Sequence, residues 1–218
     1  MLVGVERGRW LKADLHIHSI YSEDSSLTIE QIITTCRRQS FDIISITDHN
    51  TFEGALKASS YAKNYNDITI LIGIEIMTNL GELIVIGDGP FDVSYDAYEL
   101  IDIAHSMGYL VIAPHPYDIW RKGVRDHIYN LNIDAIEVYN TSSSGKAVEK
   151  ALNVAKALSK PAIGSSDAHT VRELNTSYTV IHSIDNVINV KTIIDSIKTG
   201  KVKPYFRSVS RIFSRLFR

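Results

Sequence analysis

The sequence predicts a single-domain α/β fold, and three observations support this prediction. Short apolar, β-branched runs alternate with helical patterns along almost the whole chain. Most of these runs are apolar nearly throughout, as in strands of a parallel sheet that is covered on both faces. The chain has 218 residues, a length that suits one domain. The alternation therefore favours a parallel α/β fold, either open or closed into a barrel.

Eight runs are expected to form strands, and five segments between them are expected to form helices. The strands are predicted over residues 12–18, 42–48, 68–76, 82–87, 109–115, 134–140, 161–167 and 177–183. The helices, where apolar residues recur at helical spacing, are predicted over 28–39, 52–65, 96–107, 146–159 and 189–199. The segment TNLGE, residues 78–82, indicates a hairpin turn between the third and fourth strands.

Composition and charge are those of an ordinary globular protein. The net charge of −2 gives no sign of a general nucleic-acid-binding surface. The apolar runs are too short to span a bilayer, and the charged N-terminal segment does not resemble a signal peptide. The single cysteine, Cys36, falls on the apolar face of an expected helix. These features predict a cytoplasmic protein with no membrane span.

The end of the chain differs in composition from the rest. Residues 201–218 contain six basic and no acidic residues. We therefore separate a body, residues 1–200, from a basic amphipathic tail, residues 201–218. The tail is expected to form a helix that packs on the body or at a homo-oligomer contact, and a membrane-surface or nucleic-acid helix is the alternative. Its apolar face would consist of Phe206, Val209, Phe213, Leu216 and Phe217.

Five of the eight histidines stand at or just beyond the ends of expected strands. His16 and His18 share one face of the first strand, because side chains alternate along a strand. The carboxyl ends of parallel strands meet on one face of a sheet or barrel, where active sites are built. We therefore expect these histidines to converge with three acids. The full set is His16, His18, His49, His115 and His169 with Asp24, Glu75 and Asp167.

Imidazoles and carboxylates are the ligands of zinc, manganese and iron. Because one such ion takes about four to six ligands, eight candidates predict two or three divalent ions. Each motif alone has a structural explanation, such as an Asp–His hydrogen bond at a helix start. Five motifs at the ends of five strands would each need a separate explanation of that kind. The other histidines, His105, His127 and His182, are expected to be structural.

The motifs DLHIHSIYSEDSS, ITDHN, GIEI, APHP and GSSDAH occur in this order. With them the chain resembles the PHP (polymerase and histidinol phosphatase) family, over roughly residues 11 to 200. The resemblance implies a distorted, TIM-like (β/α)7 barrel with a two- or three-metal site at its C-terminal face. It also implies hydrolysis of a phosphate ester, either a small phosphomonoester or the end of a nucleotide or oligonucleotide.

The resemblance also implies roles for individual residues. The eight residues above match the family's metal ligands, with Glu23 as the alternative to Asp24. His18, His169 and Asp48 are the implied catalytic residues, and Asp48 is expected to orient a ligand imidazole from behind.

Two positions depart from the family pattern. Many relatives have a histidine where this chain has Glu82, and some have a histidine or cysteine near Glu137, Tyr139 and Asn140. Glu82 and Asn140 are expected to support the ligands, and Glu82 is an equal candidate for a ligand.

A phosphorylated substrate also needs a cationic contact from the protein. Arg121, Arg125 and Lys146 follow strands on the expected active face, and each has a solvated surface charge as its alternative. Two other functions remain open. One is a non-catalytic scaffold in a nucleic-acid-processing assembly, and the other is a metal-dependent amidohydrolase, although no lysine stands at a strand end to support it.

Overall fold

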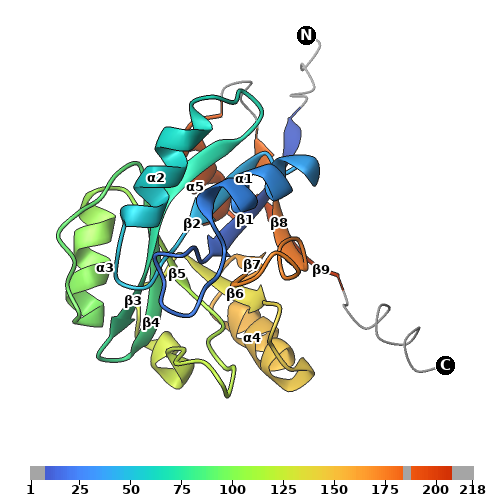
Figure 1. Cartoon of the computed structure of the whole chain (residues 1–218). Coiled ribbons are helices and arrows are strands. Elements are labelled where there is room, and N and C mark those ends of the chain that lie inside the picture. Colours follow the sequence, from blue (N-terminus) through green and yellow to red (C-terminus); the bar gives the residue numbers. More distant parts are fainter. Residues whose placement is uncertain (1–7, 184–187, 208–218) are drawn as a thin grey trace, which may run out of the picture.

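The computed structural model describes residues 8–183 and 188–207, and these form one curved, mixed sheet with helices packed against it (Figure 1). The sheet order is β7-β6-β5-β4-β3-β2-β1-β8-β9. The strands are β1 (Arg9–Ile17), β2 (Ile43–Ile46), β3 (Thr69–Thr78), β4 (Gly81–Gly87), β5 (Leu110–Ala113), β6 (Ala135–Tyr139), β7 (Ala162–Gly164), β8 (Ser177–Ser183) and β9 (Val202–Phe206). The helices are α1 (Ile29–Arg38), α2 (Glu53–Ala62), α3 (Ala97–Ser106), the 3-10 helix η1 (Arg125–Tyr129), α4 (Gly145–Ala157) and α5 (Val190–Lys198).

The barrel closes where the segment after β7 meets the end of β1. Ile17 and Ala168 form a parallel β-bridge. The amide of Asp167 donates to the carbonyl of His16 at 2.8 Å, and the amide of His18 donates to the carbonyl of Ala168 at 3.0 Å. This closure confirms the predicted distorted α/β barrel. It places His16 and His18 directly against the segment SDAH, residues 166–169.

The sheet is mixed, so the expectation of parallel strands is wrong for β4 and β8. The predicted turn at 78–82 is present. Gly81 adopts a φ of +123°, at which the backbone of a residue with a side chain would be strained. A tight hairpin leaves no room for a crossover helix, and β4 therefore runs antiparallel to β3. As a result, β4 begins on the face where β3 ends, and Glu82 pairs with Met77.

Helix α1 shows how the local sequence fixes an element. The Thr28 hydroxyl accepts from the amide of Gln31, and the Gln31 side chain accepts from the amide of Thr28. These two bonds form a capping box at the N-terminus of the helix. One face of the helix buries Ile32, Ile33 and Cys36. Cys36 is a free core cysteine, as predicted.

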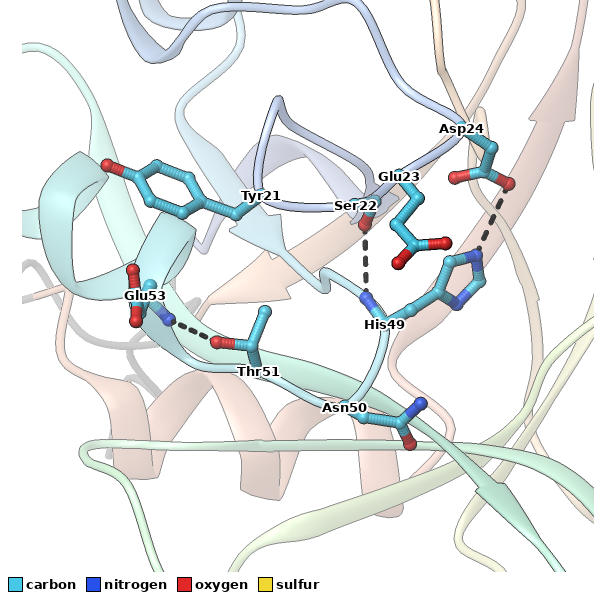
Figure 2. A pocket seen from close by; sticks show the side chains of 8 residues that line it. All are labelled: Tyr21, Ser22, Glu23, Asp24, His49, Asn50, Thr51 and Glu53. Carbon is cyan, nitrogen blue, oxygen red and sulfur yellow. Dashed lines mark hydrogen bonds and ion pairs between the residues drawn. The ribbon is translucent and has the colours of Figure 1, made fainter.

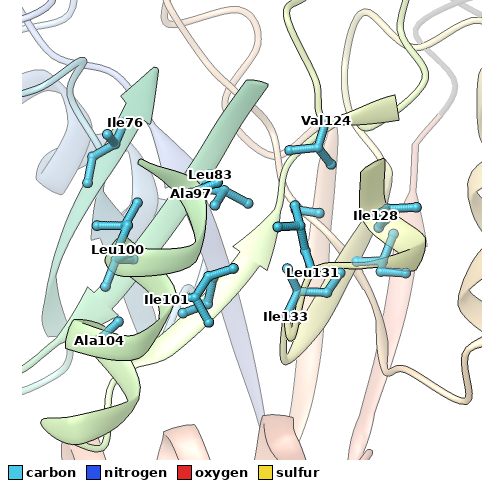
Figure 3. Close-up of a cluster of buried hydrophobic side chains, with 14 of the residues drawn as sticks. Ile76, Leu83, Ala97, Leu100, Ile101, Ala104, Val124, Ile128, Leu131 and Ile133 are labelled. Carbon is cyan, nitrogen blue, oxygen red and sulfur yellow. The ribbon is translucent and has the colours of Figure 1, made fainter. Parts of the chain in front are cut away.

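A second cluster of apolar residues supports the side of the barrel where η1 lies (Figure 3). Leu100 and Ile101 of α3 pack into it from one side, and Val124 and Ile128 from the segment around η1. This 3-10 helix was not expected from the sequence. Its packing fixes the C-terminal end of the loop that follows β5.

The start of the predicted tail is a strand. Residues 202–206 form β9 and pair antiparallel with β8, from Ser177 opposite Phe206 to Ile181 opposite Val202. The helix expected there is wrong for these residues, because the open edge of β8 provides hydrogen-bond partners that helical periodicity does not reveal. Residues 208–218, with the remainder of the expected helix, lie outside the described residues. Within the described chain, no helix has the length and apolar character needed to cross a membrane.

Candidate metal centre

The predicted histidines and acids converge at the carboxyl ends of the barrel strands. They fall into four overlapping groups, and within each group the ligand atoms lie within 4.8 Å of one another. The groups are His16, His18 and Glu75; His16, His115 and Asp167; Glu75, Glu82 and His115; and His18, Asp24, His49 and His169.

Glu75 lies at the middle of this cluster, buried near the end of β3. One carboxylate oxygen, Oε1, lies 3.2 Å from Nε2 of His115 and 3.5 Å from Nε2 of His16. The other, Oε2, lies 3.3 Å from Nε2 of His18 and 3.1 Å from Nδ1 of His49. A carboxylate with two occupied sides suits a ligand that bridges two cations.

His16 and His18 point to the same place from the end of β1, as the alternation of side chains predicts. Their Nε2 atoms are 3.0 Å apart. Asp167 Oδ1 lies 3.3 Å from the first and 3.2 Å from the second. All three side chains are buried.

A chain of hydrogen bonds fixes the orientation of His18. The Ser22 hydroxyl donates to Oδ1 of Asp48 at 2.8 Å, so it accepts from Nδ1 of His18 at 3.0 Å. Asp48 also accepts from the amide and the hydroxyl of Ser19, both at 2.6 Å. Because Nδ1 of His18 holds the proton, its Nε2 faces the cluster with a free lone pair. Asp48 thus acts on His18 through Ser22.

Glu137 fixes the orientation of His16 in a similar way. Its Oε1 lies 3.2 Å from Nδ1 of His16, and its Oε2 accepts from the amide of His115 at 2.9 Å and from Nδ2 of Asn140 at 3.1 Å. Asn140 also donates to Oδ2 of Asp167 at 3.0 Å. Asn140 therefore stands behind the cluster where it was expected. No role had been predicted for Glu137, because a glutamate inside an apolar strand pattern gives no signal of its partner.

The outer end of the cluster is partly open to solvent. Asp24 Oδ2 lies 3.2 Å from Nε2 of His169 and 3.4 Å from Nε2 of His49. Glu23, the alternative to Asp24, is absent from the groups of close ligand atoms found among the described residues, and Asp24 belongs to one of them. The geometry therefore favours Asp24.

Glu82 lies close to the cluster from the start of β4. Its Oε2 is 3.9 Å from Nδ1 of His115 and accepts from the amide of Lys122 at 3.1 Å. Burial and the nearby Glu75 carboxylate raise the pKa of Glu82. Its position suits either a ligand or a support for His115.

The chemistry of these donors fits metal ions. The Nε2 atoms of His16 and His18 face each other at 3.0 Å beside carboxylate oxygens, an arrangement that needs positive charge, either from protons on the imidazoles or from a metal ion. Three buried ligand atoms also lack a hydrogen-bond partner: Nδ1 of His115, Oδ1 of Asp167 and Nε2 of His169. Buried polar atoms of this kind need a partner, and a metal ion would supply it.

The pKa shifts show how strongly the groups depend on each other. Burial disfavours the charged form of His16, but Asp167, Glu75 and Glu137 outweigh it and raise its pKa well above the usual value. Burial likewise opposes ionisation of Glu75, yet His16 and His115 hold its pKa well below the usual range. The pKa of His49 rises to about 9, because Glu75 and Asp24 outweigh its burial. The cluster therefore requires positive charge among its carboxylates.

Two ligand candidates have unusual backbone conformations. His115 has a φ of 27° and Asp167 a φ of 51°. Non-glycine residues rarely adopt these values, and the strain they store is typically found at functional sites. His115 lies two residues beyond the end of β5 and Asp167 three residues beyond the end of β7, and the side chains of both lie in the cluster.

The cationic residues predicted to bind phosphate divide into two groups. The Arg121 guanidinium lies 2.8 Å from Oδ2 of Asp167 and is partly exposed at the rim. Arg125 and Lys146 are exposed, and within the described chain neither side chain forms an ion pair. The structural histidines lie elsewhere, with His105 bound to Asp134 at 3.0 Å and His182 against the Trp10 ring.

A pocket of about 610 Å³ opens beside the outer cluster (Figure 2). His49 and Asp24 face each other at one side of it, and the His49 amide donates to Ser22 at 3.0 Å. The remaining lining comes from Tyr21, Glu23, Asn50, Thr51 and Glu53. Three of the lining residues, Glu23, Asp24 and Glu53, are acidic.

The chain is similar to several known proteins. An uncharacterized protein of Methanocaldococcus jannaschii is 35% identical over 143 residues, which cover 60% of this chain and 82% of that protein. The crystal structure of PsfC from Pseudomonas syringae matches with a TM-score of 0.75 and 19% identity over 96% of this chain and 98% of that one.

Two further solved structures share the fold at low identity. A Bifidobacterium adolescentis protein, provisionally described as a metal-dependent phosphoesterase, has a TM-score of 0.60 and 15% identity, covering 72% of this chain and 87% of that one. An amidohydrolase from Chromobacterium violaceum has a TM-score of 0.65 and 14% identity, covering 91% and 99%. Family models match as well, the PHP domain at residues 14–115 and the PHP-associated region at 145–202. With these matches and this buried His/Asp/Glu cluster, the chain belongs to the PHP domain family.

Proposed function

We propose that this protein hydrolyses a phosphate ester, with water as the nucleophile and two or three divalent ions as cofactors. The observation that supports this most directly is the pair of free Nε2 atoms of His16 and His18 beside the carboxylates of Glu75 and Asp167. When bound, such ions supply a water of lowered pKa and positive charge at the phosphoryl oxygens. No serine or cysteine nucleophile is then needed.

The ligand set is the eight residues predicted from the sequence, His16, His18, Asp24, His49, Glu75, His115, Asp167 and His169. Glu75 stands between the inner and outer groups and would bridge them. Glu137 and Asp48 hold the imidazoles of His16 and His18 in the tautomers that leave Nε2 free. Asp48 is therefore a positioning residue in this proposal rather than one that touches the substrate.

Arg121 is the residue proposed to bind the phosphate. A guanidinium offers paired donors to phosphoryl oxygens, and this one reaches the buried side of the centre while remaining partly exposed. Arg125 and Lys146 would help only by long-range attraction.

His169 is proposed to protonate the leaving oxygen through Nε2 when that atom is not bound to a metal ion, because its Nδ1 donates to the carbonyl of Asp167 at 2.9 Å. Its side chain lies beside Asp24 at the outer end of the cluster and is 12% exposed. His18, the other candidate, is completely buried and has its Nδ1 proton bound to Ser22. The rim position therefore favours His169 over His18 for proton transfer.

The substrate class that fits is a small phosphomonoester or a nucleotide. The acidic pocket beside the centre disfavours polyanions, and this argues against a long nucleic-acid strand. Hydrolysis of an amide is the second candidate, because an amidohydrolase shares the fold. Phosphate is favoured over an amide because Arg121 lies at the centre.

The test is a hydrolysis screen of the protein reconstituted with Mn²⁺ or Zn²⁺. Sugar phosphates, nucleoside monophosphates and N-acyl amino acids serve as substrates, and release of phosphate or of amine is measured. We expect phosphate release that is lost in His16→Ala/His18→Ala and retained in His127→Ala, an exposed histidine outside the cluster. Amine release without phosphate release would establish the amidohydrolase. No turnover of any substrate would favour a scaffold.

A further inference from the structure

The loop between β5 and η1 presents two apolar side chains to solvent next to the centre. Trp120 is 84% exposed and Ile119 is 67% exposed, the highest values among the large hydrophobic residues of the described chain. Exposed aromatic residues of this kind commonly mark a binding surface. The next residue, Arg121, contacts Asp167, and consecutive Cα atoms are only about 3.8 Å apart.

The tip of this loop is held in place by hydrogen bonds. Buried Asp118 accepts from the amide of Trp120 at 2.9 Å, which forms a tight turn at the tip. Its other oxygen accepts from the Ser142 hydroxyl at 3.4 Å. On the far side, the amide of Lys122 donates to Glu82, and the carbonyl of Lys122 accepts from the Glu82 amide at 2.8 Å.

These anchors connect the loop to the metal centre itself. Glu82 belongs to one of the metal-ligating groups, and the loop begins at His115, which belongs to two of them. Gly123 pairs with Glu82 as a β-bridge and approaches the His115 carbonyl so closely that a Cβ there would lie 2.6 Å from it. The backbone that carries Trp120 is therefore anchored at the rim of the centre.

We infer that Trp120 is a specificity-determining residue, on which a planar ring in the substrate's leaving group stacks, and that the substrate is a nucleoside monophosphate. This inference rests on the proposed phosphoesterase function. The phosphate would bind at the centre and Arg121, and the base would lie against Trp120. Hydrolysis breaks the ester P–O bond, adds the water oxygen to phosphorus and leaves a proton on the nucleoside hydroxyl.

The chemistry of the surroundings supports a single phosphate and a flat ring. A polyphosphate would place extra charge near Glu23, Asp24 and Glu53 in the neighbouring pocket. An indole face stacks on any nucleobase without requiring a particular hydrogen-bond pattern. Ile119 adds apolar surface beside it.

The chain contains only two tryptophans, which makes the inference directly measurable. In a Trp10→Phe variant, Trp120 is the single indole. Trp10 lies at the start of β1, near the end of the barrel away from the centre. In the metal-loaded variant, we expect saturable quenching of Trp120 fluorescence by a nucleoside monophosphate. We expect no quenching from ribose 5-phosphate at a concentration that occupies the site to the same extent. That concentration is found from its inhibition of nucleoside monophosphate hydrolysis.

Kinetics provide a second, independent readout. The ratio of kcat/KM for a nucleoside monophosphate to that for ribose 5-phosphate should fall about tenfold in Trp120→Ala, mainly through KM. Trp120→Phe should restore most of the ratio, because phenylalanine also stacks. An unchanged ratio, with no quenching, would overturn the inference while leaving the phosphoesterase intact. Failure to hydrolyse either ester would instead reject the proposed function.

Discussion

Nδ1 of His16 lies 3.2 Å from Oε1 of Glu137, on the opposite side of the ring from the Nε2 atom that faces Asp167. The carboxylate therefore holds the proton on Nδ1 and leaves Nε2 free for a metal ion. Three donors converge on Glu137, from His16, the His115 amide and Asn140. One buried acid thereby connects three elements of the site.

Replacing Glu137 with glutamine should weaken metal binding. The amide nitrogen of the new side chain would face one of these donors, and the negative charge behind His16 would be lost. We expect Glu137→Gln to raise the metal Kd about 10- to 100-fold, measured by competition with a chelator. Glu149→Gln, on the exposed face of α4, is the matched control. A folded Glu137→Gln protein with the wild-type Kd would contradict this role.

Gly54 allows Asp48 to approach the start of α2. A Cβ at this position would lie 1.9 Å from Oδ2 of Asp48 and 2.5 Å from Oγ of Ser19. Glycine-to-alanine changes within helices usually stabilise a protein by about 0.5–1 kcal/mol. Here we expect Gly54→Ala to destabilise by about 1–3 kcal/mol in urea unfolding, because the clash displaces Asp48.

Ser60→Ala, on the exposed side of the same helix, serves as its control. It should change the free energy of unfolding by less than about 0.5 kcal/mol. A stabilising Gly54→Ala would show that Asp48 does not need this close approach.

Stabilisation by metal should increase with pH. In the metal-free protein the pKa of His49 is raised to about 9 and that of His16 lies well above its usual value. Their ion pairs therefore stabilise fully below about pH 6.5, and this contribution is lost as the pH rises through the raised values. The lowered pKa values of Glu75 and Asp167 mean that their contribution is present above about pH 4.5 and lost only in stronger acid.

Metal binding needs neutral imidazoles, so protons compete with it. The difference in Tm between metal-loaded and metal-free protein should therefore grow from about pH 6 to pH 8. Thermal unfolding at matched ionic strength measures it. A difference that shrinks over this range would show that the histidines are not ligands.

Arg121 should contribute to phosphate binding, and Arg125 at the start of η1 should not. Arg121→Met removes the guanidinium beside Asp167, and we expect kcat/KM for a phosphate ester to fall about tenfold or more. Arg125→Met, an exposed arginine four residues later, should change it less than about twofold. Equal losses in both variants would indicate only a general effect of charge.

Much of the site follows from the sequence because its signals are local. His16 and His18 share a strand face by simple alternation, and His115 and His169 stand just past apolar runs that end abruptly. The position of Asp24 is also set locally, on the loop that leaves β1. The segment TNLGE predicts the hairpin at Gly81, and a hairpin reverses the direction of the strand that follows it.

The features that sequence reasoning missed depend on pairing between distant segments. Glu137 looks like one polar residue in an apolar strand, and only the fold shows that it meets His16, 121 residues away. Strand β9 was hidden because residues 202–206 also fit a helical pattern, and the decisive factor is the open edge of β8. Arg121 and Arg125 look equivalent in sequence, and the turn at Asp118 distinguishes them.

The central claim is that this cluster of histidines and acids binds metal ions, and the most direct test is metal content by mass spectrometry on protein purified without chelator. We expect two or three divalent ions per chain in the wild type and in His127→Ala. In a folded His16→Ala/His18→Ala protein we expect at least one ion fewer. Equal metal content in all three proteins, or no metal in any of them after reconstitution, would contradict the account.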